Sequence, residues 1–314
     1  MLDQIVWKDN PRYTRLRHYA ALTTRSCFRS FTVEGRENLP KDGAVMLGPN
    51  HCAAFMDPMT VLAGTDRAVG FGARSDVFAN PKTRSLLYWM RILPIARERN
   101  GLQEVTKNYE IFDEIVECMG HGLAFCLFSE GRHRAERGML PVKKGIFRVA
   151  KQAVDTLDMP VYVVPMGLDY EHFFRTQCRA AVRIGEPIDV GAFFAARPGM
   201  PEGDVYRELC AEWQARDLAL IGRIPERRHD RIALRILVSL LLLPLFAVCA
   251  AGGILIWLPH LIIMSRIKDK AWYHSVRFLL HLIFPLFWPF DIGFGRILGY
   301  WQDLFEDLKG KKAE

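Results

Sequence analysis

Four short apolar runs in the first two thirds of the chain predict β-strands. Segments with apolar residues at every third or fourth position lie between them, at 101–122 and 143–158, and predict helices. Short buried strands that alternate with longer helices are typical of α/β folds. We therefore expect a mixed sheet flanked by helices. The four predicted strands are AVMLGP (44–49), LAFCLF (123–128), VYVVPM (161–166) and AAVRIG (180–185).

The longest apolar run lies in the last third of the chain. Residues 236–263 contain no Asp, Glu, Lys or Arg, and as one helix they would extend about 42 Å, against about 30 Å for a hydrocarbon core. A second run at 278–290 contains two prolines and is too short for a regular span. We expect a membrane-embedded C-terminal helical region. Prolines and the Gly252–Gly253 pair should break the first run into a re-entrant or hairpin element with both flanks in the cytoplasm.

Composition divides the chain into three predicted parts. Residues 1–35 are an N-terminal amphipathic segment, 36–222 a catalytic domain, and 223–314 a membrane-embedded region and tail. Arginines mixed with Tyr, Leu and Phe at 11–35 favour a basic amphipathic helix, which either contacts a membrane surface or packs on the domain. The N-terminus lacks the features of a signal peptide, so we expect the catalytic part to face the cytoplasm.

Charge and cysteine usage narrow the classes of partner. A net charge of +7 indicates acidic partners, among them nucleic acid, anionic lipids and phosphorylated metabolites. The basic residues concentrate around the apolar runs rather than on one soluble element, so we expect no nucleic-acid partner. Seven scattered cysteines without a C-x-x-C pair indicate reduced thiols in the cytoplasm. A zinc site would need clustered His and Cys ligands, and the sequence has no such cluster, so we expect no metal site.

His51 and Asp57 follow the first predicted strand, in NHCAAFMDP. A carboxylate can fix the tautomer of an imidazole, so that the other ring nitrogen takes a proton from a hydroxyl group. Six positions on an ideal helix separate two side chains by about 240°, so the pair cannot share one helical face. A turn or helix start after the strand must bring them together.

Three further segments carry polar residues suited to an anionic ligand. Arg97 follows a short apolar stretch and suits a phosphate. Glu130, Gly131 and Arg132 follow the second predicted strand, at the carboxyl end where open α/β sheets bind ligands. Lys144 lies beside a predicted helix N-terminus, which favours anions. Lys144 can equally be an ordinary surface residue.

These segments together resemble a known family. NHCAAFMDP, ILPIAR, FSEGR followed by LPVKKG, and VYVVPMG occur in the order and approximate spacing of the four blocks of the glycerolipid acyltransferases, the family of 1-acylglycerol-3-phosphate acyltransferases. The resemblance covers roughly residues 30–190. It implies an acyltransferase-like α/β domain that acylates a membrane lipid precursor.

The resemblance also implies residue roles. His51 would be the general base and Asp57 its orienting partner. Arg97 would bind the phosphate, and Glu130 with Gly131 would form the acceptor-site element. The fourth block, around Val164 and Pro165, would belong to the acyl-donor side.

Two positions depart from the family pattern. Five residues rather than four separate His51 from Asp57, as in a variant subgroup of bacterial members, so an altered turn must absorb the extra residue. The third block has Ser129 in place of proline and His133 where arginine is expected. Either Arg132 or Arg134 supplies the missing guanidinium, and we favour Arg132.

The reaction implied by the resemblance transfers an acyl chain to the hydroxyl of lysophosphatidic acid. Acyl-carrier protein or acyl-coenzyme A would supply the thioester, and Arg97, Arg132 and Lys144 would anchor the phosphate. It requires no cofactor, metal or covalent enzyme intermediate. Glycerol 3-phosphate or a lyso-aminolipid are alternative acceptors, and a catalytically silent lipid-binding protein is an alternative of another class. The expected partners are the lysophospholipid, the acyl thioester and the bilayer, at the cytoplasmic face of a membrane, the inner membrane in a bacterium.

Overall fold

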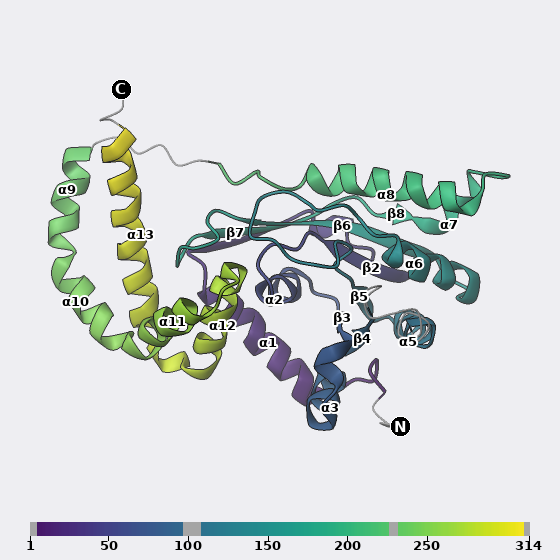
Figure 1. The fold of residues 1–314 in the computed structure, drawn as a ribbon, viewed down its shortest axis with the longest axis horizontal. Helices are drawn as coiled ribbons and strands as arrows, with labels where there is room; N and C mark the ends of the chain where they lie inside the picture. The colour runs from purple at the N-terminus through teal and green to yellow at the C-terminus, as the bar shows by residue number, and fades with distance from the viewer. Residues whose placement is uncertain (1–4, 97–107, 226–231, 311–314) are drawn as a thin grey trace.

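The structure, a computed structural model, describes residues 5–96, 108–225 and 232–310 (Figure 1). Its centre is an 8-stranded mixed sheet in the order β1-β7-β6-β2-β5-β3-β4, with β8 paired to β6 beside this path. The strands are parallel to their neighbours except at β6, which is antiparallel to β7 and β8. The strands are β1 (Ser30–Glu34), β2 (Ala44–Pro49), β3 (Val69–Arg74), β4 (Ile92–Ile95), β5 (Ala124–Cys126), β6 (Val161–Tyr170), β7 (Arg179–Ile184) and β8 (Ile188–Asp189).

Helices cover both faces of this sheet. The strand β2 is buried throughout, and its side chains alternate between two hydrophobic cores: Met46 lies in one and Leu47 in the other. Because both faces are covered, the strand is a continuous apolar run. The predicted mixed sheet flanked by helices is confirmed. One core contains α5 (Asn108–Gly120), α6 (Gly145–Thr156), α7 (Val190–Ala195) and α8 (Glu202–Leu218), and the other contains α1 (Pro11–Ser26) and α2 (Met56–Gly64).

Shorter elements complete this part of the chain. The helix α3 (Pro81–Trp89) begins with Asn80 as its N-cap and a proline in its first turn, and leads into the strand β4. Two 3₁₀ turns, η1 (Arg36–Asn38) and η2 (Ser75–Phe78), follow β1 and β3. The connections that leave the carboxyl ends of β2 and β5 carry the predicted site residues other than Arg97.

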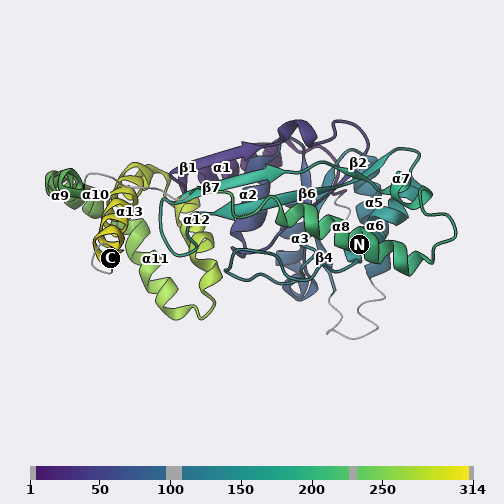
Figure 2. The ribbon, with the colours of Figure 1, turned by 90° about the horizontal axis from the view of Figure 1, so that it is seen from above.

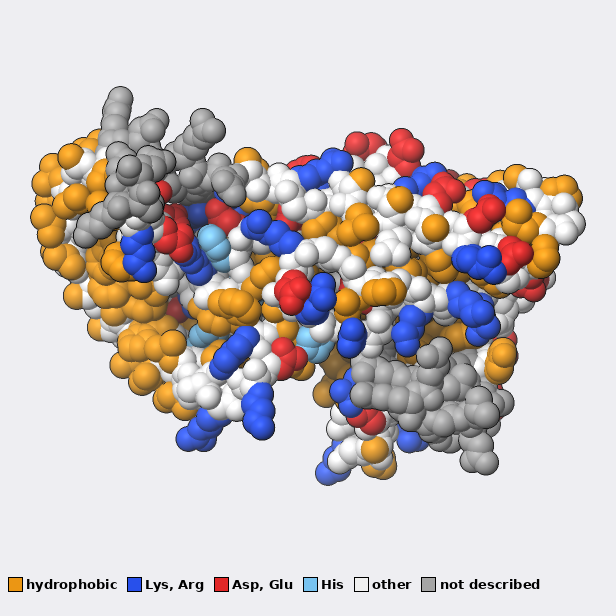
Figure 3. All heavy atoms as spheres, turned by 45° about the horizontal axis from the view of Figure 1, so that its top comes forward, with side chains coloured by type: hydrophobic (Ala, Val, Ile, Leu, Met, Phe, Trp, Pro, Cys, Tyr) orange, Lys and Arg blue, Asp and Glu red, His pale blue; other side chains and the backbone are white. Residues whose placement is uncertain are grey.

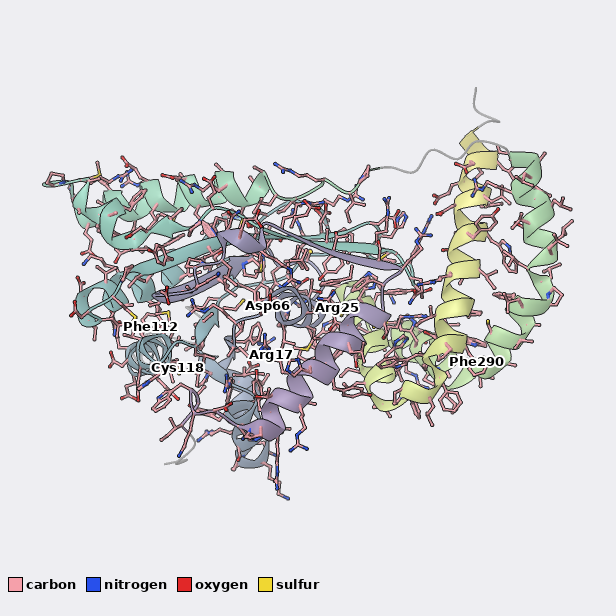
Figure 4. The ribbon with its side chains drawn as sticks, turned by 180° about the vertical axis from the view of Figure 1, so that it is seen from behind. Arg17, Arg25, Asp66, Phe112, Cys118 and Phe290 are labelled. Carbon is pink, nitrogen blue, oxygen red and sulfur yellow. The ribbon has the colours of Figure 1, made fainter. Side chains whose placement is uncertain are left out.

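The N-terminal helix α1 packs against α2, and two of its arginines face the domain. Arg17 donates to the carbonyl oxygens of Thr65 (2.9 Å) and Arg67 (2.7 Å), and Arg25 donates to that of Ala63 (2.8 Å). Figure 4 shows Arg17 and Arg25 on α1 from behind. These bonds satisfy carbonyls at the end of α2. The domain boundaries at residues 35 and 222 stay a prediction, although β1 already lies in the sheet.

Residues 232–310, here the C-terminal region, form a helical unit at one end of the sheet (Figures 1 and 2). The apolar run breaks after Leu241 and again at Gly253, so the predicted break at Gly252–Gly253 is confirmed. Gly252 has space for no side chain, because a Cβ there would lie 2.4 Å from the ring of Phe290. The elements are α9 (Ile232–Leu241), α10 (Leu243–Gly252), α11 (Ile254–Arg266), η4 (Lys270–Trp272), α12 (Tyr273–Ile283), η5 (Pro285–Phe287) and α13 (Trp288–Gly310).

Within the described residues, no single helix has both the length and the apolar composition needed to cross a bilayer. Two bent helix pairs meet both requirements together: Ile232–Leu241 with Leu243–Gly252, bent by 52°, and Lys270–Ile283 with Pro285–Lys309, bent by 106°. Figure 3 shows hydrophobic side chains gathered over the outer end of the C-terminal region, whereas charged side chains of both signs are scattered among apolar and other atoms on the rest of that face. Membrane embedding of this region stays a prediction.

Candidate active site

The candidate site begins where β2 ends. Asn50 is buried, and its side chain continues the pairing with β6: its Oδ1 accepts from the amide of Leu168 (2.7 Å), and its Nδ2 donates to the Leu168 carbonyl (3.1 Å). The side chain thus takes the place of the next residue in the ladder. The backbone can therefore leave the sheet at His51, before α2 begins at Met56.

His51 and Asp57 form the predicted pair. Nδ1 of His51 lies 2.7 Å from Oδ2 of Asp57, which is fully buried, while the His51 side chain keeps 16% of its surface exposed. The same Oδ2 accepts from the amides of Cys52 (2.8 Å) and Ala53 (2.7 Å). A carboxylate in this position selects the tautomer with the proton on Nδ1. Nε2 is then the ring nitrogen that can accept a proton.

A turn with a residue in the left-handed conformation accommodates the longer spacing between His51 and Asp57. Ala54 has φ +49°, within the turn in which the amide of Met56 donates to the carbonyl of Ala53 (3.0 Å). For a residue with a Cβ atom this conformation costs about 1–2 kcal/mol. The turn shortens the path from His51 to the first helical turn. The five-residue spacing is thus compatible with the His51–Asp57 bond.

Tyr170 holds the second oxygen of Asp57. Its hydroxyl, at the end of β6, donates to Oδ1 of Asp57 and lies equally close to the Thr60 hydroxyl, at 2.9 Å from each. Burial, followed by the negative charge of Asp57, raises the pKa of Tyr170 well above its usual value. The phenol therefore remains a hydrogen-bond donor across the physiological range. It fixes the carboxylate plane on the side away from His51.

Two rings flank the imidazole of His51. Phe128 stacks on it, with 4.1 Å between the ring centroids, and His133 meets it edge-on at 5.2 Å. The amide of Arg134 donates to the carbonyl of His51 (3.1 Å). The connection after β5 therefore lies directly against His51. The first and third sequence blocks meet at the carboxyl edge of the sheet.

Glu130 joins these two connections through backbone amides. Its Oε1 accepts from the amide of His51 (2.6 Å) and its Oε2 from that of Leu140 (2.8 Å). Burial raises the pKa of Glu130, and the two amide bonds oppose that shift. Both oxygens bind the chain itself. In this geometry Glu130 positions the amide of His51, and its place in the acceptor-site element stays a prediction.

The remaining residues predicted to bind the acceptor lie in different surroundings. Gly131 has φ +69° and closes a turn by donating to the carbonyl of Phe128 (3.0 Å). Arg132 follows it and is exposed, and the exposed Lys144 immediately precedes α6. Both basic residues lie on the connection between β5 and α6, which contacts His51. Arg97 lies outside the described residues.

Cys52, beside the base, is unsuited to covalent catalysis. It is 2% exposed, and burial raises the pKa of its thiol well above the usual value, with Asp57 and Glu130 adding to the effect. The thiolate is the nucleophilic form of cysteine. The protonated thiol leaves His51 as the group able to activate an external hydroxyl. Among residues 5–96, 108–225 and 232–310, no group of three or more His, Cys, Asp or Glu could hold a metal ion.

Comparison with known proteins relates the part of the chain that contains this site to a family. Residues 30–169 match the acyltransferase family model. Over 102 residues the chain is 29% identical to glycerol-3-phosphate O-acyltransferase 1 of Saccharomyces cerevisiae, which is 32% of this chain and 13% of that protein. These matches support assignment of residues 30–169 to the glycerolipid acyltransferase family.

One further protein is similar over a shorter stretch, and one solved structure is similar at lower sequence identity. An uncharacterised acyltransferase of Schizosaccharomyces pombe is 31% identical over 91 residues, which is 28% of this chain and 13% of that protein. The crystal structure of the 1-acyl-sn-glycerophosphate acyltransferase PlsC of Thermotoga maritima has a TM-score of 0.48 and 19% identity, and covers 69% of this chain and 81% of that one. The chain spans about an eighth of the length of the two yeast relatives.

The fourth block of the family lies within the sheet. Val164 and Pro165 belong to β6 and pair with Leu47 and Gly48 of β2, with both side chains buried. A Cβ on Gly48 would lie 2.2 Å from the ring of Trp213, so only glycine fits there. In the structure this block supports the strand that carries His51. Its role on the acyl-donor side stays a prediction.

Sequence reasoning missed several residues of this acyltransferase site. Asn50 and Tyr170 hold the ends of β2 and β6 in place, and Ser275 reaches the first block from α12. Asn50 is the first residue of the quoted block NHCAAFMDP and Tyr170 lies three residues after VYVVPMG, so their position was a usable signal. Ser275 lies 219 residues from its partner Met56, and no spacing in the sequence indicates that contact.

Proposed function

We propose that this protein is a membrane-bound O-acyltransferase that transfers a fatty acyl chain from a thioester donor to the free hydroxyl of lysophosphatidic acid. The product is phosphatidic acid. His51 removes the proton from the acceptor hydroxyl, the resulting alkoxide attacks the thioester carbonyl, the C–S bond breaks, and the leaving thiolate takes the proton back from the His51 imidazolium. Acyl-carrier protein or coenzyme A carries the acyl group.

The 2.7 Å bond between His51 Nδ1 and Asp57 Oδ2 carries this proposal. A general base needs a neutral imidazole with one nitrogen accessible and the other fixed, and this bond supplies the fixed one. The carboxylate also stabilises the imidazolium that forms when the base takes its proton. Burial of Asp57 strengthens this interaction because solvent does not screen it.

Basic residues beside the dyad support a phosphate-bearing acceptor. Arg132 and Lys144 are exposed on the connection that contacts His51, and the α6 N-terminus adds its own partial positive charge. Arg97 is proposed as a third phosphate ligand on the strength of the family motif. An acceptor anchored by its phosphate would present a glycerol hydroxyl to Nε2 of His51.

A second acceptor has specific support. One relative is named a glycerol-3-phosphate O-acyltransferase, and glycerol 3-phosphate carries the same phosphate and hydroxyl groups as lysophosphatidic acid. The two acceptors differ in their acyl chain. The apolar surface of the C-terminal region favours the acceptor that resides in a bilayer, at the cytoplasmic face of the membrane.

An acyl-transfer assay on detergent-purified protein tests the proposal. The protein is supplied with labelled acyl-coenzyme A or acyl-carrier protein, and with lysophosphatidic acid, glycerol 3-phosphate or a lyso-aminolipid. We expect phosphatidic acid from the wild type and a loss of at least about 10³-fold in His51→Ala. His121→Ala is the matched control, because His121 is exposed and stacks on Trp7 at the opposite edge of the sheet.

Each outcome assigns the function differently. Product from glycerol 3-phosphate or a lyso-aminolipid alone would keep the chemistry and change the acceptor. Activity retained in His51→Ala would refute the assignment of the base. The absence of product from every acceptor would indicate a lipid-binding protein that lacks catalysis.

A further inference from the structure

The C-terminal region touches the catalytic loop through a buried serine. Ser275 lies on α12 and is fully buried. Its hydroxyl accepts from the amide of Met56 (3.0 Å) and donates to the carbonyl of Ala53 (3.0 Å). Those two groups are the ends of the turn that contains the left-handed Ala54. One hydroxyl group therefore holds both ends of the turn between His51 and Asp57.

A second contact reaches the other side of the dyad. Oδ2 of Asp269, just before η4, lies 2.7 Å from Nε2 of His133. The His133 ring is the one that meets His51 edge-on, and the next residue, Arg134, bonds to the His51 carbonyl. Asp269 thereby links the C-terminal region to the connection that carries Arg132. Ser275 therefore contacts the turn that follows His51, and Asp269 contacts the His133 ring that packs against His51.

We propose that the C-terminal region completes the active site, with Ser275 and Asp269 acting as positioning residues for the first and third blocks. This inference rests on the proposed acyltransferase function. The five-residue spacing makes the loop from His51 to Asp57 dependent on a strained turn, and a strained conformation persists only where surrounding contacts enforce it. Ser275 supplies such contacts from outside the acyltransferase domain. Membrane attachment and catalytic geometry therefore share one structural element.

The two residues should affect different kinetic constants. Ser275→Ala removes both bonds to the turn, which displaces Asp57 relative to His51 and weakens the base. We expect kcat to fall about tenfold with the acceptor KM changed less than about twofold, since a displaced catalytic group slows the reaction without changing ground-state binding. Ser265→Ala is the matched control, because the exposed Ser265 on α11 bonds only to its own helix, at Ile262. Its kcat should equal that of the wild type.

Asp269→Asn tests the contact on the acceptor side. Asp269 is 53% exposed, so the substitution leaves the fold intact, and the amide retains an acceptor for the Ala271 amide. We expect the acceptor KM to rise about fivefold, with kcat within about twofold of the wild type. The matched control is Asp66→Asn, an exposed carboxylate paired with Arg36 at the surface of the domain (Figure 4).

Hydrogen exchange separates this inference from the proposed function. Amide exchange of the segment 50–58, measured by mass spectrometry on the full chain in detergent, reports the turn whether or not a substrate is found. We expect Ser275→Ala to exchange at least about tenfold faster than Ser265→Ala in this segment. Faster exchange in a protein inactive on all acceptors would support the positioning contact and refute the proposed function. Unchanged exchange, or wild-type kcat in Ser275→Ala, would overturn the inference and leave the proposed function in place.

Discussion

The carboxylate of Asp57 holds its position through bonds from one ring nitrogen, two backbone amides and one phenol. The donors come from the loop after β2 and from the end of β6, so the strand pairing of the sheet sets the carboxylate position. The imidazole of His51 then has one orientation relative to the carboxyl edge. The residues that surround Asp57 thus determine where the His51 ring lies.

Tyr170→Phe tests this arrangement at a single atom. The change removes the donor to Oδ1 of Asp57 and leaves a buried carboxylate oxygen with one bond fewer. We expect a loss of about 1.5–3 kcal/mol in unfolding free energy and a kcat lowered about threefold to tenfold with unchanged acceptor KM. Thermal unfolding and steady-state kinetics measure the two effects.

The matched control for that substitution is Tyr19→Phe. The Tyr19 hydroxyl donates to the carbonyl of Leu282 (2.7 Å), away from the dyad. The Tyr19→Phe variant should lose some unfolding free energy and keep the kcat of the wild type. A kcat reduction of the same size in both variants would mean that Tyr170 acts only through general stability.

At the level of elements, α8 is joined to the sheet by a buried carboxyl group. Oδ1 of Asp217 accepts from the amide of Met166 on β6 (2.9 Å), and Asp217 is fully buried. Burial raises its pKa well above the usual value for aspartate, although the amide bond opposes the shift. The folded protein therefore retains this proton at pH values where the unfolded chain has lost it, from about pH 4 upward.

The raised pKa of Asp217 predicts a stability that falls with pH. Between the unfolded pKa and the raised folded pKa, the native state binds more protons than the unfolded state, so each pH unit in that window costs about 1.4 kcal/mol. Asp217→Asn mimics the protonated form and should remove this slope, which makes the variant more stable than the wild type at pH 8. Thermal unfolding from pH 5 to pH 8 measures the difference.

The control for this pH series lies on the same helix. Asp204 pairs with Arg207 at the surface, and Asp204→Asn should leave the pH dependence of the wild type unchanged. Parallel curves for wild type and Asp217→Asn would show that Asp217 is ionised in the folded protein.

A second buried network joins three helices. Asp291 on α13 accepts from Arg277 and from Nε2 of His281 (2.8 Å), both on α12, and Nδ1 of His281 lies 2.8 Å from the hydroxyl of Ser26 at the end of α1. Arg277, His281 and Asp291 are fully buried. This network ties the C-terminal region to the N-terminal helix.

Removing one charge from the network should be far more costly than removing both. Asp291→Ala leaves the Arg277 guanidinium buried without its carboxylate, and we expect a loss of about 3–5 kcal/mol in unfolding free energy. The double variant Arg277→Met with Asp291→Leu should recover most of that loss, as apolar replacements of buried pairs do.

Denaturation in detergent measures both network variants, with Asp155→Ala as the control. Asp155 forms a surface pair with Lys151 and should cost less than about 1 kcal/mol. A double variant as unstable as Asp291→Ala would contradict the electrostatic explanation.

The strands that could be predicted from the sequence differ in burial and composition from those that were missed. The strands β2, β6 and β7 lie inside the sheet and are almost entirely buried, and each contains an apolar stretch that single-sequence patterns detect. By contrast, β1 alternates between exposed and half-buried residues, β3 contains two glycines, and β4 contains a proline. Each of these features weakens the strand signal. Neighbouring strands in the sheet supply the stability that these segments lack locally.

The same limit applies to the site. The motif predicts the His51–Asp57 pair because both residues lie in one short segment after a strand, where a turn can bring them together. Tyr170 and Ser275 reach the same loop from far along the chain, and only the folded sheet and α12 bring them there. Long-range partners of a motif therefore come from the structure.

At the scale of the whole molecule, the C-terminal region has two chemically different sides. Its inner side binds the rest of the chain through charged pairs, such as Arg175 with Asp303 and Glu306. Its outer side exposes apolar side chains on α9 and α10 that water does not stabilise. The most exposed of these include Leu237 (54%), Leu241 (71%), Leu245 (52%) and Val248 (58%).

This outer side should attach the protein to lipid. Exposed Arg266, Lys268 and Lys270 follow the apolar helices and lie close to Asp269, so a bilayer that covers the apolar side would meet basic residues near the catalytic edge. Leu237→Glu with Leu241→Glu places two charges in that surface, at a cost of up to about 3 kcal/mol each near the hydrocarbon. We expect co-flotation with anionic vesicles to fall at least about tenfold.

Leu218→Glu is the matched control for the flotation experiment, because Leu218 is 43% exposed on α8 within the acyltransferase domain. Equal flotation of the double variant and the wild type would mean that another surface contacts the bilayer. If only the double variant detaches, its activity toward a detergent-dispersed acceptor should be retained, because Ser275 and Asp269 remain in place. Activity toward the same acceptor in vesicles should be lost. That difference would separate delivery of the lipid from the chemistry at His51.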